Sequence, residues 1–287
     1  MLRFTKILFP VDFSRRSERI APRVASFAHY FQAQLTLIHA YEVSPPAYFD
    51  GQAWVETVDP QSLGEYARQQ LAQFAQTHFE SLQPEILIVR GEPAHAILEH
   101  AAAAKVDLIM LPTRGFGRFR RLLLGSVSAK VLHDASCPVW TDSHAEEVDH
   151  HTGFPYRNIL CAVNRDEHSE PVLKFGLELA SCLGASLNLV HAVHIAEVAG
   201  PGFDEAAFRH FLLEQAKADL GRLQQKVGSS VETYVEIGPP EEVIARLARK
   251  LNADLVVIHR SGPSLIGRLR SQDYAIIRES PCPVLSI

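Results

Sequence analysis

The sequence predicts an α/β protein of two tandem domains, each a doubly wound layer of five parallel strands with helices on both faces. Three observations support this fold class. The chain has 287 residues, about twice the ~150 of a typical domain. Its second half repeats the residue pattern of its first half. Within each half, short apolar runs alternate with segments of helical spacing, which is the pattern of parallel strands joined by helices.

The repeat is visible when the two halves are aligned. TKILFPVDFSRRSE at 5–18 aligns with RNILCAVNRDEHSE at 157–170, and Ile, Leu, Val, Ser and Glu match. Near the ends of the halves, SCPVW at 136–140 aligns with PCPVL at 281–285. The separation falls from 152 to 145 positions between these alignments, which two short deletions in the second half explain. We therefore interpret the halves as duplicates of one domain.

Each half predicts five strands that alternate with four helices. The strands of the first half are the apolar runs KILFPV, LTLIHA, EILIV, DLIML and CPVWT, which suit a sheet buried on both faces. The helices cover 17–31, 62–83, 93–104 and a segment that opens at Gly125 or Ser126. Pro22 lies in the first helix and predicts a kink or a late start, because proline cannot donate to the preceding turn. The Pro- and Gly-rich segment 43–61 predicts a long loop.

Composition and charge narrow the function classes. With 47% apolar and 21% charged residues, the chain can form folded cores. A formal charge of -5 argues against nucleic-acid binding. No apolar run approaches the ~18 residues of a membrane-spanning helix and the amino end lacks a signal-peptide core, so we expect a cytoplasmic protein without membrane contact. The four cysteines occur singly, as expected of reduced core residues.

The boundary between the domains falls in a histidine-rich stretch. DSHAEEVDHH at 142–151 is acidic and irregular, whereas metal ligation needs ligands held at fixed spacing. We interpret this stretch as a solvated linker and predict no metal site. The predicted organisation is a domain at 1–143, a linker at 144–155 and a second domain at 156–287.

Several features converge on one edge of the first predicted sheet. In an open parallel sheet, ligands bind beyond the carboxyl ends of the strands, near the point where strand order reverses. The residues that end three strands are Pro10, Val11 and Asp12; His39 and Ala40; and Leu111, Pro112, Thr113 and Arg114. The glycine-flanked turn GFGRFRRLLLGS at 115–126 then leads into a helix, whose free N–H groups and positive dipole end favour phosphate.

Each of these features also has a purely structural explanation. Asp12 and Ser126 are suitable helix caps. An arginine run such as Arg118, Arg120 and Arg121 is commonly a solvated face. His39 and His191 are better explained as hydrogen-bonded core residues than as ligands. Because the features meet at one sheet edge, nucleotide binding is the favoured interpretation.

Taken together, these residues resemble the universal stress protein family. The tandem repeat, VDFS after the first strand, GEP before the third helix and TRGFGRFRRLLLGSVSAKVLHDASCPV at 113–139 carry the resemblance, which covers both halves and is more specific in the first. It implies a Rossmann-like fold, similar to adenine-nucleotide α-hydrolases. It also implies that the halves pair through CPVWT and CPVLSI as an internal pseudo-dimer, and it leaves open whether the tandem unit dimerises again.

The resemblance also implies a nucleotide site in the first domain. ATP-binding members carry Gly, two residues, Gly, nine residues, Gly and Ser or Thr; Gly115, Gly125 and Ser126 match this pattern, whereas Pro112 replaces the first glycine. The residues implied to bind ATP, or alternatively ADP or AMP, with Mg, are Pro10, Val11, Asp12, Ala40, Leu111, Thr113, Arg114, Gly115, Gly125, Ser126, Val127 and Ser128.

The second half departs further from the motif. Asn164, His259 and Arg270 replace Asp12, Pro112 and Gly125, and a bulky Arg fills the space that glycine leaves open. We therefore predict that the second domain does not bind ATP in the same way.

The function implied is a stress-response module that binds ATP in its first domain and regulates an unknown protein partner with little or no hydrolysis. We find no P-loop, GxSxG or HExxH motif, so no catalytic residue is assigned. The alternatives are a scaffold that binds no nucleotide and a weak ATPase, since positioned phosphates and a metal can suffice for hydrolysis.

Overall fold

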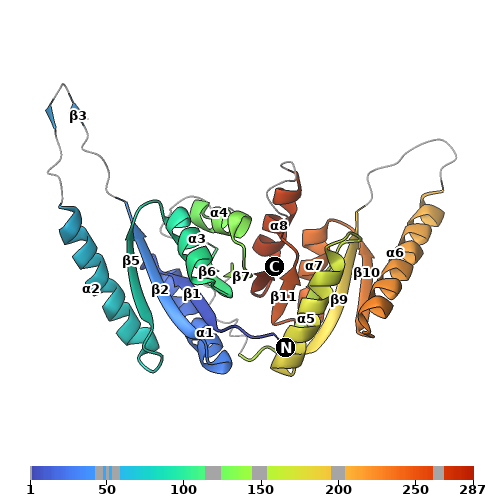
Figure 1. Cartoon of the computed structure of the whole chain (residues 1–287). Helices are drawn as coiled ribbons and strands as arrows, with labels where there is room; N and C mark the ends of the chain where they lie inside the picture. The colour runs from blue at the N-terminus through green and yellow to red at the C-terminus, as the bar shows by residue number, and fades with distance from the viewer. Residues whose placement is uncertain are drawn as a thin grey trace. The chain divides into compact units, whose positions relative to one another are not determined.

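The structure is a computed structural model that describes residues 2–42, 48–49, 52–53, 59–113, 124–143, 154–194, 204–260 and 268–287. These residues form two compact units, drawn in Figure 1. The first unit runs from Phe4 to Val139, apart from a short stretch before Gly125. The second unit contains Trp140–Ile287 together with the residues that precede Phe4.

The first unit alternates strands and helices, as the sequence predicts. Its elements are β1 (Lys6–Pro10), α1 (Arg15–Phe31), β2 (Gln34–Tyr41), β3 (Tyr48–Phe49), β4 (Gln52–Ala53), α2 (Pro60–Phe79), β5 (Glu85–Arg90), α3 (Pro93–Ala104), β6 (Leu108–Pro112), α4 (Ser126–Asp134) and the start of β7 (Val139–Asp142). The strands β6, β1, β2 and β5 lie in that order and pair in parallel. Strand order therefore reverses between β1 and β6.

The second unit has the same order of elements. They are β8 (Asn158–Ala162), α5 (Ser169–Leu183), β9 (Ser186–Val193), α6 (Glu205–Val227), β10 (Glu232–Ile237), α7 (Pro240–Lys250), β11 (Leu255–Ile258), α8 (Arg268–Glu279) and β12 (Val284–Ser286). Its strands run in the order β12, β11, β8, β9 and β10, and all pair in parallel. The predicted α/β fold class with two doubly wound copies is confirmed.

The duplication extends to single hydrogen bonds. Asp107, just before β6, accepts bonds on Oδ2 from the backbone N–H groups of Thr5 (2.6 Å) and Lys6 (2.9 Å). Asp254, just before β11, accepts the equivalent bond from the N–H of Arg157 (2.5 Å). In both copies, one carboxylate therefore connects the start of the first strand (β1 or β8) with the start of the strand that pairs beside it (β6 or β11).

Two details of the first unit differ from the sequence prediction. The helix α1 begins at Arg15 and continues through Pro22, so the predicted late start is wrong. Pro22 removes only one donor, and buried Ile20 and Val24 on either side of it pack the helix against the sheet. The segment predicted as a loop contains a short antiparallel pair, in which Tyr48 is opposite Ala53.

Three of the four cysteines, Cys137, Cys161 and Cys282, are buried, as expected, whereas Cys182 is partly exposed. Burial raises the pKa of the Cys161 thiol to about 12. Within the described ranges, no helix combines the length and apolar character that crossing a lipid bilayer requires.

Candidate functional site

The strand register places three of the predicted site residues on one face of the first sheet. Pro10 in β1 is the register partner of Ile38 in β2. Leu8, two residues before Pro10, is the register partner of Ile109 in β6. Side chains alternate along a strand, so Ala40 and Leu111, each two residues further on, share the face of Pro10. Leu111 is buried, and Pro10 and Ala40 are partly exposed. These side chains form one surface at the carboxyl edge of the sheet.

This surface is on the side of the sheet away from α2. Phe9 points to the opposite face, where its ring lies 6.2 Å from Phe74 and 6.0 Å from Phe79 of α2, measured between ring centroids. Figure 1 shows α3 and α4 on the other side of these strands from α2. The surface formed by Pro10, Ala40 and Leu111 is therefore on the side from which α4 approaches the sheet edge.

The helix α4 begins next to the end of β6. The N–H of Gly125 donates to the carbonyl oxygen of Thr113 (2.9 Å), which fixes the turn against the strand. Gly125 is the N-cap residue, so the cap position itself supplies no side-chain acceptor to the first N–H groups of the helix. The first N–H groups of α4, on Ser126 and Val127, thus combine with the positive end of the helix dipole, which is the arrangement that binds anions.

Three of the residues implied to bind ATP lie at the start of α4 and have different environments. Ser126 is exposed and Val127 is partly exposed. Ser128 is buried, and its hydroxyl donates to the carbonyl oxygen of Pro112 (3.0 Å). The Ser128 hydroxyl therefore joins α4 to β6, which leaves its backbone N–H as the group that can face a ligand.

Asp12 follows β1 and is held by the first turn of α1. Its Oδ1 accepts hydrogen bonds from the N–H of Ser14 (3.0 Å) and the hydroxyl of Ser17 (2.6 Å). The N-cap residue of α1 is Ser14, whose side chain accepts from the N–H of Ser17. Asp12 is therefore not the helix cap that the structural alternative suggested. Its side chain is partly exposed.

His39 and His191 have equivalent structural roles, as predicted. His39 donates from Nδ1 to the carbonyl oxygen of Val11 (2.7 Å), and His191 donates to that of Val163 (2.9 Å). Sequence reasoning missed Phe13, whose ring lies against that of His39 with centroids 4.4 Å apart and whose φ is +58°. A positive φ is unusual for a non-glycine residue, and only tertiary contacts reveal it.

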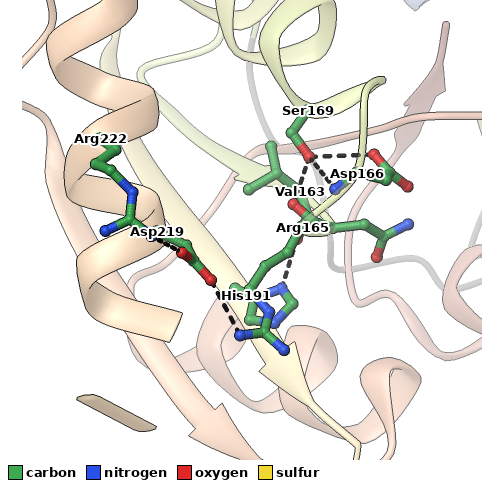
Figure 2. Close-up of polar contacts among 8 residues, drawn as sticks. Val163, Arg165, Asp166, Ser169, His191, Asp219 and Arg222 are labelled. Atoms are coloured by element: carbon green, nitrogen blue, oxygen red, sulfur yellow. Dashed lines mark hydrogen bonds and ion pairs between the residues drawn. The ribbon is translucent and has the colours of Figure 1, made fainter. Parts of the chain in front are cut away.

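In the second copy, a charged network replaces this aromatic contact (Figure 2). Arg165, which takes the position of Phe13, forms an ion pair with Asp219 of α6 (3.1 Å between Nη1 and Oδ2). Asp219 also accepts a hydrogen bond from Arg222. Burial lowers the pKa of His191, an effect that its bond to Val163 opposes and the charge of Arg165 adds to.

The remaining second-copy positions also differ from the first copy. Asn164, the counterpart of Asp12, is exposed. The ring of His259, at the position of Pro112, stacks on His168 with centroids 4.1 Å apart and planes 10° apart. Burial and then the charge of His168 lower the pKa of His259. The helix α8 starts at Arg268, so Arg270 lies inside a helix where the first copy has the N-cap Gly125.

Some predicted residues lie outside the described part of the chain. Among them are Arg114 and Gly115 of the predicted site, the arginines of the same turn and the histidine-rich residues 144–153. Within the described ranges, no group of three or more His, Cys, Asp or Glu side chains could hold a metal ion.

Comparison with known proteins identifies relatives of both copies. The family model described as "Universal stress protein family" matches residues 3–141 and 155–287. A curated universal stress protein of Thermus aquaticus is 35% identical over 136 residues, covering 47% of this chain and 96% of that protein. One of Methanocaldococcus jannaschii is 31% identical over 138 residues, covering 47% and 80%. The crystal structure of a universal stress protein from Archaeoglobus fulgidus shares the fold over 99% of this chain and 98% of its own, with a TM-score of 0.69 and 22% identity.

Proposed function

The chain belongs to the universal stress protein family, with two tandem copies of the family's domain, and from this premise we propose that its first copy binds an adenine nucleotide and acts as a nucleotide-dependent regulator. The observation that carries the proposal is the start of α4. Its N-cap residue, Gly125, has no side chain to accept from the first N–H groups, and the helix begins at the end of β6, next to the point where strand order reverses. Ligands of doubly wound sheets bind at this point.

The described residues suit the separate parts of a nucleotide. Pro10 and Ala40 are apolar and partly exposed, so they can take the base, whereas Leu111 is buried on the same face of the sheet. Asp12 is an acceptor for ribose hydroxyls or the amino group of adenine. The N–H groups of Ser126, Val127 and Ser128 can hold phosphate oxygens at the positive end of α4. Arg114 and Gly115 are assigned to the same phosphate site by resemblance to the family motif.

Pro112 changes how phosphate is held. It lies within β6, it has no N–H to donate, and its carbonyl oxygen already accepts the Ser128 hydroxyl. The residues present still fit a nucleotide, because the donors at the start of α4 do not depend on position 112. We expect ATP, ADP or AMP to bind chiefly through these donors and Asp12, with Mg neutralising the phosphate charge.

We assign no equivalent nucleotide site to the second copy. Arg270 lies inside α8 at the position of the Gly125 cap, and Arg260 takes the position of Thr113. The second copy then serves as a partner of the first that does not bind nucleotide. The tandem unit would present its bound nucleotide to a protein partner with little or no hydrolysis.

Calorimetric titration of the full chain with ATP, ADP and AMP, with and without Mg, tests the proposal. The parent is expected to bind one nucleotide per chain. Asp12→Ala should weaken binding about tenfold or more, since hydrogen bonds to charged groups contribute about 1.5–3 kcal/mol. Asn164→Ala is the matched control at the same position of the second copy and should bind as the parent does. If the parent binds none of the three, the protein is a scaffold without nucleotide and the proposal is wrong.

A further inference from the structure

Ser17 lies in a position to control the orientation of the Asp12 carboxylate. Ser17 is fully buried in the first turn of α1, and its hydroxyl donates to Asp12 Oδ1 at 2.6 Å. The N–H of Ser14 donates to the same oxygen at 3.0 Å. Two donors on one carboxylate oxygen fix the rotation of the side chain. The hydrogen bonds that Asp12 accepts within the described residues fall on Oδ1, so Oδ2 is the oxygen that is left for a ligand.

The surrounding turn holds Ser17 rigidly. The side chain of Ser14 accepts from the N–H of Ser17 (3.3 Å), which is the usual bond of a helix N-cap to its third residue. The backbone and the hydroxyl of Ser17 are therefore tied to two different residues at the end of β1. A buried donor placed in this way has little freedom to turn to another partner.

The second copy shows what the same serine does without the carboxylate. Ser169 is the counterpart of Ser17 and is also buried. Its hydroxyl bonds to the backbone oxygen of Asn164 and to Oδ1 of Asp166 (3.2 Å), as Figure 2 shows for Asp166. The side chain of Asn164, at the position of Asp12, receives no bond from it in the described structure. The serine is present in both copies, but it orients the side chain at the ligand edge only in the first.

We propose that Ser17 is a positioning residue for nucleotide recognition, which sets the Asp12 carboxylate so that Oδ2 faces the ribose or base. The inference rests on the proposed nucleotide site of the first copy. Ser17 acts through Asp12 and does not itself contact the ligand. Without the hydroxyl, the carboxylate loses its stronger anchor and must be ordered by the nucleotide on binding, which lowers the affinity.

The test compares nucleotide affinity in four variants of the full chain, measured by calorimetry with ADP. Ser17→Ala should raise the Kd about tenfold, the loss expected for one hydrogen bond to a charged group. Ser17→Thr keeps the hydroxyl and should restore most of the affinity. Ser169→Ala, the matched change in the second copy, should leave the Kd unchanged. Ser17→Ala added to Asp12→Ala should cause no further loss, because both changes remove the same contribution.

The thermal unfolding midpoint of each variant separates positioning from a general structural role. A structural role alone would lower the midpoint and leave the Kd as it is, and Ser17→Ala with the parent's Kd overturns the inference. A full further loss in the Asp12→Ala background also overturns it, because Ser17 would then act independently of Asp12. Absence of nucleotide binding by the parent overturns both this inference and the proposed function, whereas a parent that binds and a Ser17→Ala variant that binds equally well overturns the inference alone.

Discussion

The hydroxyl of Ser128 in α4 donates a hydrogen bond to the carbonyl oxygen of Pro112 in β6, at 3.0 Å. Both residues are buried, so the bond lies in the protein interior. It ties the start of α4 to the strand end from which the predicted phosphate turn departs. The resemblance to the family implies that Ser128 binds ATP, whereas in the structure its hydroxyl joins α4 to β6.

Ser128→Ala should destabilise the first unit more than it changes nucleotide affinity. Removal of the hydroxyl leaves the Pro112 carbonyl buried without this donor, which costs about 1–3 kcal/mol. Ser126→Ala is the matched change at an exposed position and should alter stability by no more than about 0.5 kcal/mol. Urea unfolding gives the free energies, and calorimetry with ADP gives the affinities. A Ser128→Ala variant with parental stability and lost binding would show that the hydroxyl binds phosphate.

Gly125→Asp should abolish nucleotide binding without destabilising the helix α4. Gly125 has φ −64° and ψ 148°, which any residue can adopt, so the substitution brings no backbone strain. Aspartate is a better N-cap than glycine by a few tenths of a kcal/mol. Its carboxylate would occupy the free N–H groups of α4 and repel phosphate. We expect an unchanged or slightly higher unfolding midpoint together with loss of ATP binding. Retained ATP affinity would show that α4 is not part of the binding site.

Replacement of Asp107 or Asp254 by alanine should destabilise the two copies to different extents. Asp107 Oδ2 accepts three bonds, from the N–H and hydroxyl of Thr5 and from the N–H of Lys6. Asp254 Oδ2 accepts two backbone bonds. Bonds to a charged group contribute about 1.5–3 kcal/mol, so Asp107→Ala should cost more than Asp254→Ala. Hydrogen exchange at the amides of Thr5 and Arg157 reports each copy separately. Equal protection of both amides in the variants would contradict this expectation.

Mild acid should destabilise the second copy through His191 and His259. Burial lowers the pKa of both side chains below the ordinary value of 6.5, so the unfolded chain binds more protons than the folded one just below that pH. The free energy of unfolding therefore keeps its full value above pH 6.5 and decreases as the pH drops through and below 6.5. Each histidine contributes a slope of at most about 1.4 kcal/mol per pH unit.

Urea unfolding across neutral to mildly acidic pH measures this slope. His191→Gln should reduce it, because glutamine does not titrate. His95→Gln is a suitable control, since the His95 side chain is 74% exposed. A slope that is the same in the parent and in His191→Gln would show that His191 does not govern acid stability.

The sequence located most of the elements because local signals agree with the tertiary fold. Apolar runs such as LTLIHA and DLIML became the buried strands β2 and β6, since only strands buried on both faces need continuous apolar residues. The helix α4 began where glycine and serine indicated. For α1, the sequence left open a kink or a late start at Pro22; the helix begins earlier, at Arg15, and continues through Pro22, because burial of its neighbours outweighs the lost hydrogen bond.

Side-chain roles at the site were harder to assign. Asp12 and Ser128 were named from their positions at strand and helix ends, which local sequence does specify. Their partners, Ser17 and Pro112, depend on how a helix turn meets a strand end, and spacing alone does not state that contact. The stacking of His259 on His168 was equally hidden, since 91 residues separate the two rings along the chain.

By itself, the sequence determined that the chain is a duplicated α/β domain and that only the first copy keeps most of a nucleotide motif. These properties reside in hydrophobic periodicity and in glycine positions, which act locally. The tertiary structure alone decided that the Ser17 hydroxyl donates to the Asp12 carboxylate and that the Ser128 hydroxyl donates to the carbonyl oxygen of Pro112 at the end of β6. These contacts depend on burial and hydrogen-bond geometry between segments that only folding brings together.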